Sequence, residues 1–303
     1  SSILFLGTGS SSGTPHPYHL MRPESHFQAT KDSQSAYKTS IAASLGDPAN
    51  NKNYRCNPSI LIRYRGGENP EKNIIIDVGK TFRESIIRWF PRHNVSSVDA
   101  ILISHGHADA IFGLDDIRGV QDRVIVEPLN VYLSKESMDT VRKMLYYLVK
   151  DDTVANVRTV SNLKWNLLTH AKSIDLFGLE ICPVNVMHGE DMISFGFIFG
   201  KRERVCYISD VSRILPDTMR LIKSKPVDIL VIDALFRSRK YFSHFSLPEA
   251  IDAIREIRPK TAYLVGMSSE LESEETNTLL KNLLDEGLVV ELAYDGLSID
   301  VDL

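Results

Sequence analysis

Residues 99–118 read DAILISHGHADAIFGLDDIR, and the fold prediction starts from this stretch. Its apolar run ends at Ser104 and has the length of a buried strand, and His105, His107 and Asp109 follow within one short turn. Two imidazoles separated by one residue can bind one cation, while the carboxylate can reach a neighbouring cation or orient a water. A polar loop with solvated histidines is the alternative. The buried strand before the turn and the start of a helix after it favour a metal site.

Other parts of the chain carry residues that extend this pattern. An early strand closes in a glycine turn, LFLGTGSSSG at 4–13. Asp77 lies in NIIIDVG, His188 in VNVMHG, and Asp210 in VCYISDVS. In this order the chain resembles the metallo-β-lactamase superfamily, whose signature is HxHxDH at the end of a strand. The closing segments AYLVGMSSELESEETN and LAYDGLSIDV resemble the branch with the cyclic phosphodiesterase of phosphonate breakdown and its uncharacterised eukaryotic relatives.

The resemblance implies a fold and a set of metal ligands. The fold is an αββα sandwich of class α/β, with two mixed sheets and the helices outside. His105, His107, His188 and Asp210 form the first metal site in such proteins, and Asp210 bridges to a second metal. Asp77 has a largely structural role there. Each residue also has an ordinary alternative, since Asp77 and Asp210 could cap helices and His188 could belong to a turn.

Two positions depart from the family pattern. The sixth position of HxHxDH is Ala110, and Ser269 stands where the last metal histidine is expected. Both missing histidines serve the second metal, which leaves Asp109 and Asp210 as its ligands. Two carboxylates without imidazole suit manganese or magnesium better than zinc. We therefore expect one firmly bound divalent metal (zinc, manganese or iron) and a second, weakly bound one.

His244 lies in KYFSHFSLPEAI, before a helix that Ser246 caps. It could simply pack between two phenylalanines. The resemblance implies a catalytic role beside Asp109, because a histidine at this place can protonate a leaving alkoxide or donate to a phosphoryl oxygen. Further histidines, His16, His19 and His26, lie where they could line a substrate cleft, although surface positions are the simpler interpretation.

Composition and charge limit the classes of protein to which this chain can belong. The 303 residues are 43% hydrophobic and 24% charged, which is typical of a globular chain, and no apolar run reaches the ~20 residues that cross a bilayer. The net charge is −4 and the longest basic block is KRER at 201–204, which disfavours a nucleic-acid partner. The first residues lack the pattern of a secretory leader.

The cysteines indicate the cellular compartment. The three cysteines are widely spaced in apolar surroundings, at Cys56, Cys182 and Cys206. Reduced interior thiols of this kind are typical of the cytoplasm, or of the cytoplasm and nucleus.

Apolar, β-branched runs predict strands, and 3.6-residue periodicity predicts helices. The predicted strands are 3–6, 59–64, 73–77, 100–103, 129–133, 179–186, 193–199, 205–208, 227–232, 261–265, 288–293 and 297–301. The predicted helices are 80–90, 134–149, 212–223, 246–257 and 274–285. Irregular stretches are expected at 15–57 and 150–163. We predict a single domain over 1–303 with a long loop insertion at about 15–57, where substrate specificity would lie.

These observations predict a metal-dependent hydrolase that acts on a small-molecule phosphodiester or related ester through metal-activated hydroxide. A degenerate family member that serves as a binding or scaffold protein is the alternative, because two ligands are missing. A transfer-RNA 3′-processing nuclease shares the motif but needs a basic surface that this composition lacks. The sequence identifies neither the substrate nor the oligomeric state.

Overall fold

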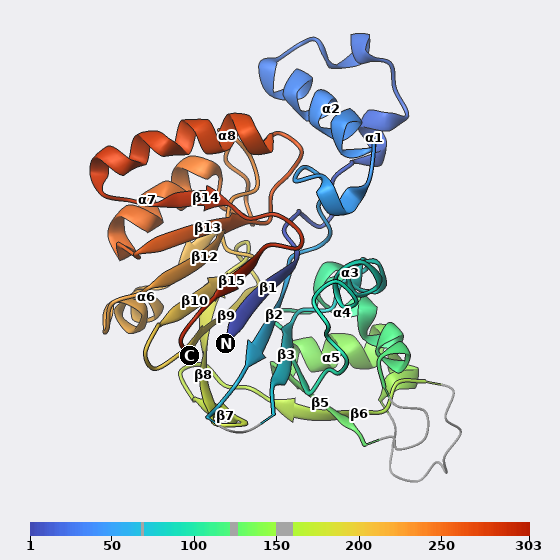
Figure 1. Ribbon diagram of the computed structural model, residues 1–303, viewed down its shortest axis with the longest axis vertical. Coiled ribbons are helices and arrows are strands. Elements are labelled where there is room, and N and C mark those ends of the chain that lie inside the picture. The colour runs from blue at the N-terminus through green and yellow to red at the C-terminus, as the bar shows by residue number, and fades with distance from the viewer. Residues whose placement is uncertain (68–69, 122–126, 150–159) are drawn as a thin grey trace.

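The β-branched runs pair into two mixed sheets in the computed structural model, which describes residues 1–67, 70–121, 127–149 and 160–303. The first sheet has the order β15 (Ser298–Asp300), β1 (Ser2–Gly7), β2 (Ser59–Tyr64), β3 (Lys72–Ile76), β4 (Ala100–Leu102), β5 (Leu129–Leu133) and β6 (Leu163–Leu167). Pairs from β15 to β3 are antiparallel and those from β3 to β6 are parallel. Because β1 pairs with β15, the two ends of the chain lie side by side (Figure 1).

The second sheet has the order β11 (Arg213–Ile214), β8 (Leu179–Met187), β9 (Ile193–Phe199), β10 (Val205–Ile208), β12 (Ile229–Asp233), β13 (Thr261–Val265) and β14 (Val290–Leu292). A short strand, β7 (Ile174–Leu176), pairs with β8. From β10 to β14 the strands are parallel. Their carboxyl ends therefore meet at one edge of the sheet, where Asp210 follows β10 and Asp233 ends β12.

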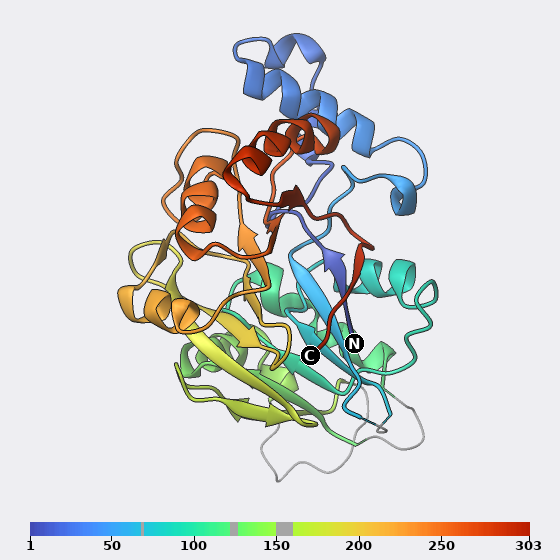
Figure 2. The ribbon, with the colours of Figure 1, turned by 60° about the vertical axis from the view of Figure 1, so that its left-hand side comes forward.

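Three apolar layers hold the sheets and helices together. One lies between the sheets and contains Phe5, Phe197 and Val231. The helices α3 (Phe82–Trp89) and α5 (Lys135–Met144) pack on the outer face of the first sheet. On the second sheet lie α6 (Pro216–Lys223), α7 (Leu247–Ile257) and α8 (Ser273–Leu280) (Figures 1 and 2). The αββα fold is confirmed.

Short helices extend or connect these elements. They are α4 (Ala108–Ile111), η3 (Phe112–Gly119), η4 (Tyr146–Leu148) and η5 (Lys281–Glu286). The helix expected at 212–223 begins later than predicted, since residues 213–214 form β11 and Pro216 occupies the first turn of α6. Of the irregular stretch expected at 150–163, residues 150–159 lie outside the described residues, and residue 163 begins β6.

The insertion at 15–57 is not the loop that the sequence predicts. It contains α1 (Pro17–Leu20), η1 (Glu24–Phe27), α2 (Lys31–Ala43) and η2 (Pro48–Asn50). The Thr30 side chain caps α2 by accepting a hydrogen bond from the Ser33 N–H. The buried positions of α2 are small or hydroxylated, namely Ala36, Thr39, Ser40 and Ala43. An apolar periodicity is therefore missing from its sequence, although one face is buried.

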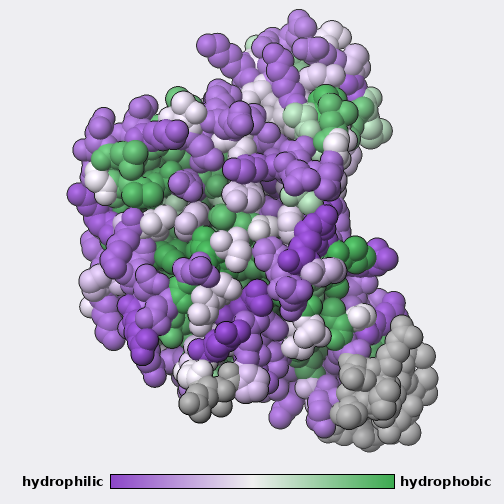
Figure 3. Space-filling model, viewed as in Figure 1, coloured by the Kyte–Doolittle hydropathy of each residue, from purple (hydrophilic) through white to green (hydrophobic). Residues whose placement is uncertain are grey.

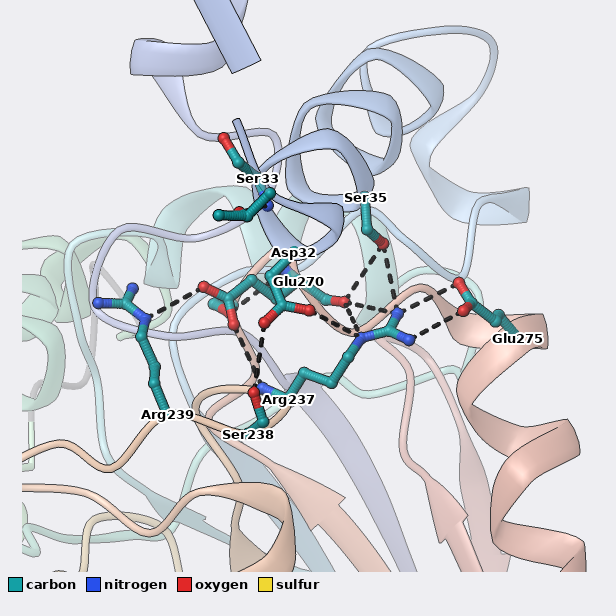
Figure 4. A network of polar contacts seen from close by, with 10 residues as sticks. Asp32, Ser33, Ser35, Arg237, Ser238, Arg239, Glu270 and Glu275 are labelled. Carbon is teal, nitrogen blue, oxygen red and sulfur yellow. Dashed lines mark hydrogen bonds and ion pairs between the residues drawn. The ribbon is translucent and has the colours of Figure 1, made fainter. Parts of the chain in front are cut away.

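Polar contacts fix α2 against the rest of the fold, beside the N-terminus of α8 (Figures 1 and 2). Arg237, which follows β12, donates to both Glu275 carboxylate oxygens at 2.8 and 3.1 Å. It also donates to Ser35 Oγ at 3.3 Å and lies 3.7 Å from Asp32 Oδ1 (Figure 4). The insertion is thus tied to the loop after β12 and, through Arg237, to the first turn of α8.

The face of the molecule seen in Figure 3 is mostly hydrophilic. On the face seen in Figure 3, apolar residues form separate patches between polar ones. Among the described residues, no helix is long and apolar enough to cross a bilayer.

Candidate metal centre

Three histidines from two sheets converge at one edge of the sandwich. His105 and His107 follow β4, and His188 follows β8. Their ring centroids are 4.7 Å (105 to 107), 5.0 Å (105 to 188) and 5.0 Å (107 to 188) apart. His188 Nε2 lies 3.2 Å from His107 Nδ1. Two nitrogens bound tetrahedrally to zinc at 2.0–2.1 Å are about 3.3 Å apart, so this spacing suits a shared cation.

A hydrogen-bonded relay orients His105. The Ser104 hydroxyl donates to Asp77 Oδ2 at 2.7 Å, and its oxygen lies 2.8 Å from His105 Nδ1. Since the hydroxyl proton is used on Asp77, the Ser104 oxygen accepts from Nδ1–H. His105 Nε2 then carries the free lone pair, and this buried atom has no hydrogen-bond partner among the described residues. A buried nitrogen of this kind needs a partner, and a divalent cation would provide it.

His188 is oriented in the same way. Its Nδ1–H donates to the Ser243 carbonyl at 2.7 Å, which leaves Nε2 free to face the other two rings. Burial lowers the pKa of His105 to about 3 and also lowers the pKa of His188. Both imidazoles are therefore neutral at ordinary pH, which is the state that binds metal.

Two buried carboxylates complete the cluster. Asp210 joins the histidines, and Asp109 Oδ1 lies 3.8 Å from His105 Nε2. Burial and the neighbouring Asp210 raise the pKa of Asp109 to about 6. Burial opposes ionisation of Asp210, but the surrounding imidazoles outweigh it and lower its pKa to about 2. A Cβ at Gly79 would collide with the Asp109 carbonyl, so glycine is required where this loop passes.

The positions of the two missing histidines are occupied differently. Ala110 is buried in the helix side of the first sheet. Ser269 Oγ lies 3.3 Å from Nδ1 of His19, a residue of the insertion. Ser40 Oγ is 2.8 Å from the same His19 nitrogen. Asp109 and Asp210 thus remain as the candidate ligands of a second metal, while an imidazole from another part of the chain stands beside Ser269.

His244, which is partly buried, pairs with the buried Asp233, and the sequence did not reveal this pair. Its Nδ1 lies 2.7 Å from Oδ2 of Asp233, and its ring centroid is 4.8 Å from that of His188. Burial favours the neutral ring, but the charge and hydrogen bond of Asp233 outweigh it and raise the pKa of His244 to about 9. The imidazole is thus protonated at neutral pH, with Nε2–H available as a proton donor.

A cavity of about 650 Å³ opens beside His244. Its walls come from the glycine turn after β1, the insertion, the loop after β12 and Ser269; we call it the insertion cavity. His16 and His19 line it. His26 instead contacts the Tyr18 hydroxyl at 2.9 Å, in an exposed position.

The cluster therefore contains every residue that the sequence predicted as a metal ligand. The donor set of neutral imidazoles and carboxylates, with one orphaned buried nitrogen, fits a divalent metal. The ligand roles themselves stay a prediction. Sequence reasoning missed Ser104 and Asp233. Asp233 ends the apolar strand ILVID just as Asp210 follows VCYIS, which was the available signal.

Comparison with known proteins identifies the family. The model of the β-lactamase superfamily domain matches residues 72–267, which include all the residues of the cluster. The chain belongs to the metallo-β-lactamase superfamily. Members of this superfamily are metal-dependent hydrolases, and the histidine and aspartate cluster suits a divalent metal.

Solved structures of this superfamily resemble the chain over its whole length. A diphosphatase of the PhnP family is 26% identical, with a TM-score of 0.75, and the match covers 100% of this chain and 97% of that one. Zinc-bound PqqB from Methylobacterium extorquens is 14% identical, with a TM-score of 0.70 over 99% and 100% of the two chains. The short form of human tRNase Z is 16% identical, with a TM-score of 0.62 over 100% of both. The latter two show the fold alone.

One curated relative is also similar. An octanoyltransferase of Porphyromonas gingivalis is 26% identical over 250 residues, which are 82% of this chain and 45% of that protein. The chain thus spans less than half the length of this relative.

Proposed function

We propose that the protein is a metal-dependent hydrolase of phosphodiesters or closely related phosphoryl esters. The proposal rests on one observation: the His105, His107 and His188 cluster lies against the Asp233–His244 pair, and His244 also lines a cavity. A cation site, an acid and a substrate-sized space are thus adjacent. The similarity to a PhnP-family diphosphatase supports phosphoryl chemistry.

His105, His107, His188 and Asp210 would hold the first metal, which we propose to be zinc, manganese or iron. A divalent cation there supplies Lewis-acid activation of water and of a phosphoryl oxygen. Asp109 and Asp210 would hold a second, weaker cation through oxygen ligands alone, a set that suits manganese or magnesium.

Asp109 and His244 have different roles in this proposal. The Asp109 carboxylate accepts a hydrogen bond from the attacking water and orients it. His244 Nε2–H donates its proton to the oxygen of the departing alcohol, because Asp233 occupies Nδ1 and keeps the ring charged. General acid catalysis of this kind contributes on the order of 100-fold or more.

A leaving-group comparison tests this assignment. The manganese- or zinc-loaded protein should hydrolyse bis(p-nitrophenyl) phosphate. It should hydrolyse more slowly a diester whose leaving group is an alkyl alcohol, such as uridine 2′,3′-cyclic phosphate. Removal of the acid by His244→Asn should slow hydrolysis of the alkyl diester on the order of 100-fold. Hydrolysis of the nitrophenyl diester should slow much less, since nitrophenolate leaves without a proton.

The control is His170→Asn, because His170 Nε2 pairs with Asp217 at 3.1 Å outside the metal cluster. It should change neither rate. Equal losses on both substrates in His244→Asn would refute the acid role. No hydrolysis of either substrate with any metal would favour the alternative, a binding or scaffold protein.

The partner and the compartment are proposals as well. The net charge of −4 supports a small-molecule substrate over a nucleic acid. The free cysteines support a cytoplasmic location, since Cys56 and Cys206 are buried as thiols.

A further inference from the structure

The polar side chains that line the insertion cavity indicate which kind of substrate group it can bind. It is lined by His16 and His19 from the insertion and by His244 from the proposed catalytic pair. A volume of about 650 Å³ lies within the range of sites for small molecules. His244 lines this cavity and, in the proposed function, donates a proton to the departing alcohol, so that alcohol would be bound here.

Hydrogen bonds of the insertion orient His16 and His19 as donors. His16 Nδ1 accepts the Tyr18 N–H at 3.1 Å, so the neutral ring carries its proton on Nε2. Ser40 Oγ accepts the His16 N–H at 3.3 Å and lies 2.8 Å from His19 Nδ1. Among the described residues, His19 Nδ1 is the acceptor available to the Ser40 hydroxyl proton. If the Ser40 hydroxyl donates to Nδ1, the neutral His19 ring carries its own proton on Nε2, as His16 does.

Both rings are neutral. Burial lowers the pKa of His16, and burial together with His16 lowers the pKa of His19 to about 4. Their centroids are 5.4 Å apart. The cavity is thus lined by two adjacent neutral imidazoles, each with an N–H donor on Nε2, a chemistry that suits hydroxyl or carbonyl oxygens.

The charged groups of the cavity are already paired. Arg239 donates to Glu270 Oε1 at 3.2 Å, and its guanidinium lies 3.4 Å above the Phe236 ring. His244 is paired with Asp233. The carboxylates of Asp32 and Glu270 also line the cavity. A second phosphate in it would meet these carboxylates with no unpaired cation among the described lining residues, which disfavours binding.

We propose that the insertion cavity binds the alcohol part of the substrate, and that His16 and His19 select an uncharged, oxygen-bearing group over one carrying a second phosphate. This inference rests on the proposed function. It makes His19 a positioning residue, held by Ser40 and Ser269, that acts on affinity more than on the chemical step.

Two cyclic diesters that differ only in one phosphate test the selectivity. The probes are uridine 2′,3′-cyclic phosphate and the same compound with a 5′-phosphate, with the manganese-loaded protein. The wild type should show a kcat/KM at least about 10-fold higher for the probe without the 5′-phosphate. His19→Leu should raise KM for that probe about 3- to 10-fold, as expected for one lost neutral hydrogen bond, with a smaller change in kcat.

Rescue and control variants separate positioning from folding. His19→Gln keeps an N–H donor near the same place and should restore most of the affinity, whereas a purely structural loss would persist. His26→Gln, on the same insertion, should leave the ratio between the probes unchanged. Equal or better hydrolysis of the 5′-phosphorylated probe overturns the inference, as does a kcat-only effect of His19→Leu.

Bis(p-nitrophenyl) phosphate distinguishes the two levels of the proposal. If it is hydrolysed while neither cyclic probe is, or while the two probes are hydrolysed equally, the cavity inference fails and the proposed function stands. If no diester is hydrolysed, both fail.

Discussion

Removal of the Ser104 hydroxyl should weaken metal binding although Ser104 is not a ligand. Its oxygen accepts from His105 Nδ1 at 2.8 Å and its proton goes to Asp77 Oδ2 at 2.7 Å. Ser104→Ala deletes both bonds in a fully buried place and leaves the His105 Nδ1–H unpaired. Loss of such outer partners typically costs 10- to 100-fold in metal affinity. That range corresponds to about 1.4 to 2.7 kcal/mol of binding free energy.

The same change should also lower the free energy of unfolding of the metal-free protein by about 1–3 kcal/mol, because a buried donor loses its partner. Competitive titration with a chromophoric chelator gives the metal Kd, and urea unfolding gives the stability. Ser194→Ala is the matched control, since Ser194 is equally buried and its hydroxyl has no partner among the described residues. A Ser104→Ala protein with wild-type metal affinity would refute the relay from Asp77 to His105.

Three further outcomes follow from the metal cluster. His107→Ala removes one of three imidazoles and should abolish the tightly bound metal in elemental analysis of the purified protein; retained metal would exclude His107 as a ligand. Asp109→Asn should lower kcat on the order of 100-fold with the first metal still bound, and an unchanged kcat would leave Asp109 a loop residue. Metal at 100 times its Kd should stabilise the fold by about 2.7 kcal/mol, seen as a higher Tm, and an unmoved Tm would argue against a native-state site.

The residues of the candidate metal cluster could be picked out from the sequence because each one is local to a strand end. His105, His107, His188 and Asp210 all follow apolar runs closely, and the convergence of strand ends brings them together without help from loops. Asp233 has the same position at the end of β12. Its proposed role depends on His244, which lies on an irregular loop 11 residues later. The path of that loop is set by tertiary contacts that a strand pattern does not contain.

Most strands were predictable for the same local reason, and the exceptions are instructive. The edge strand β6, LKWNL, is only partly buried and carries polar residues, so it shows no apolar run. The helix α2 buries Ala, Thr and Ser side chains, which leave no amphipathic signal. Its position over the cavity depends on long-range partners such as Arg237 and Glu275, and these could not be paired from sequence alone.

Hydrolysis of bis(p-nitrophenyl) phosphate during a titration with zinc, manganese and magnesium tests the proposed function most directly. The firm site of three imidazoles and Asp210 should support turnover with at least one of these metals. The loose carboxylate half-site should make the rate rise further with manganese or magnesium well above the protein concentration. Metal-dependent turnover that saturates is the expected result. A rate indistinguishable from the metal-only blank with all three ions would contradict a hydrolase and leave a protein that binds metal without catalysis.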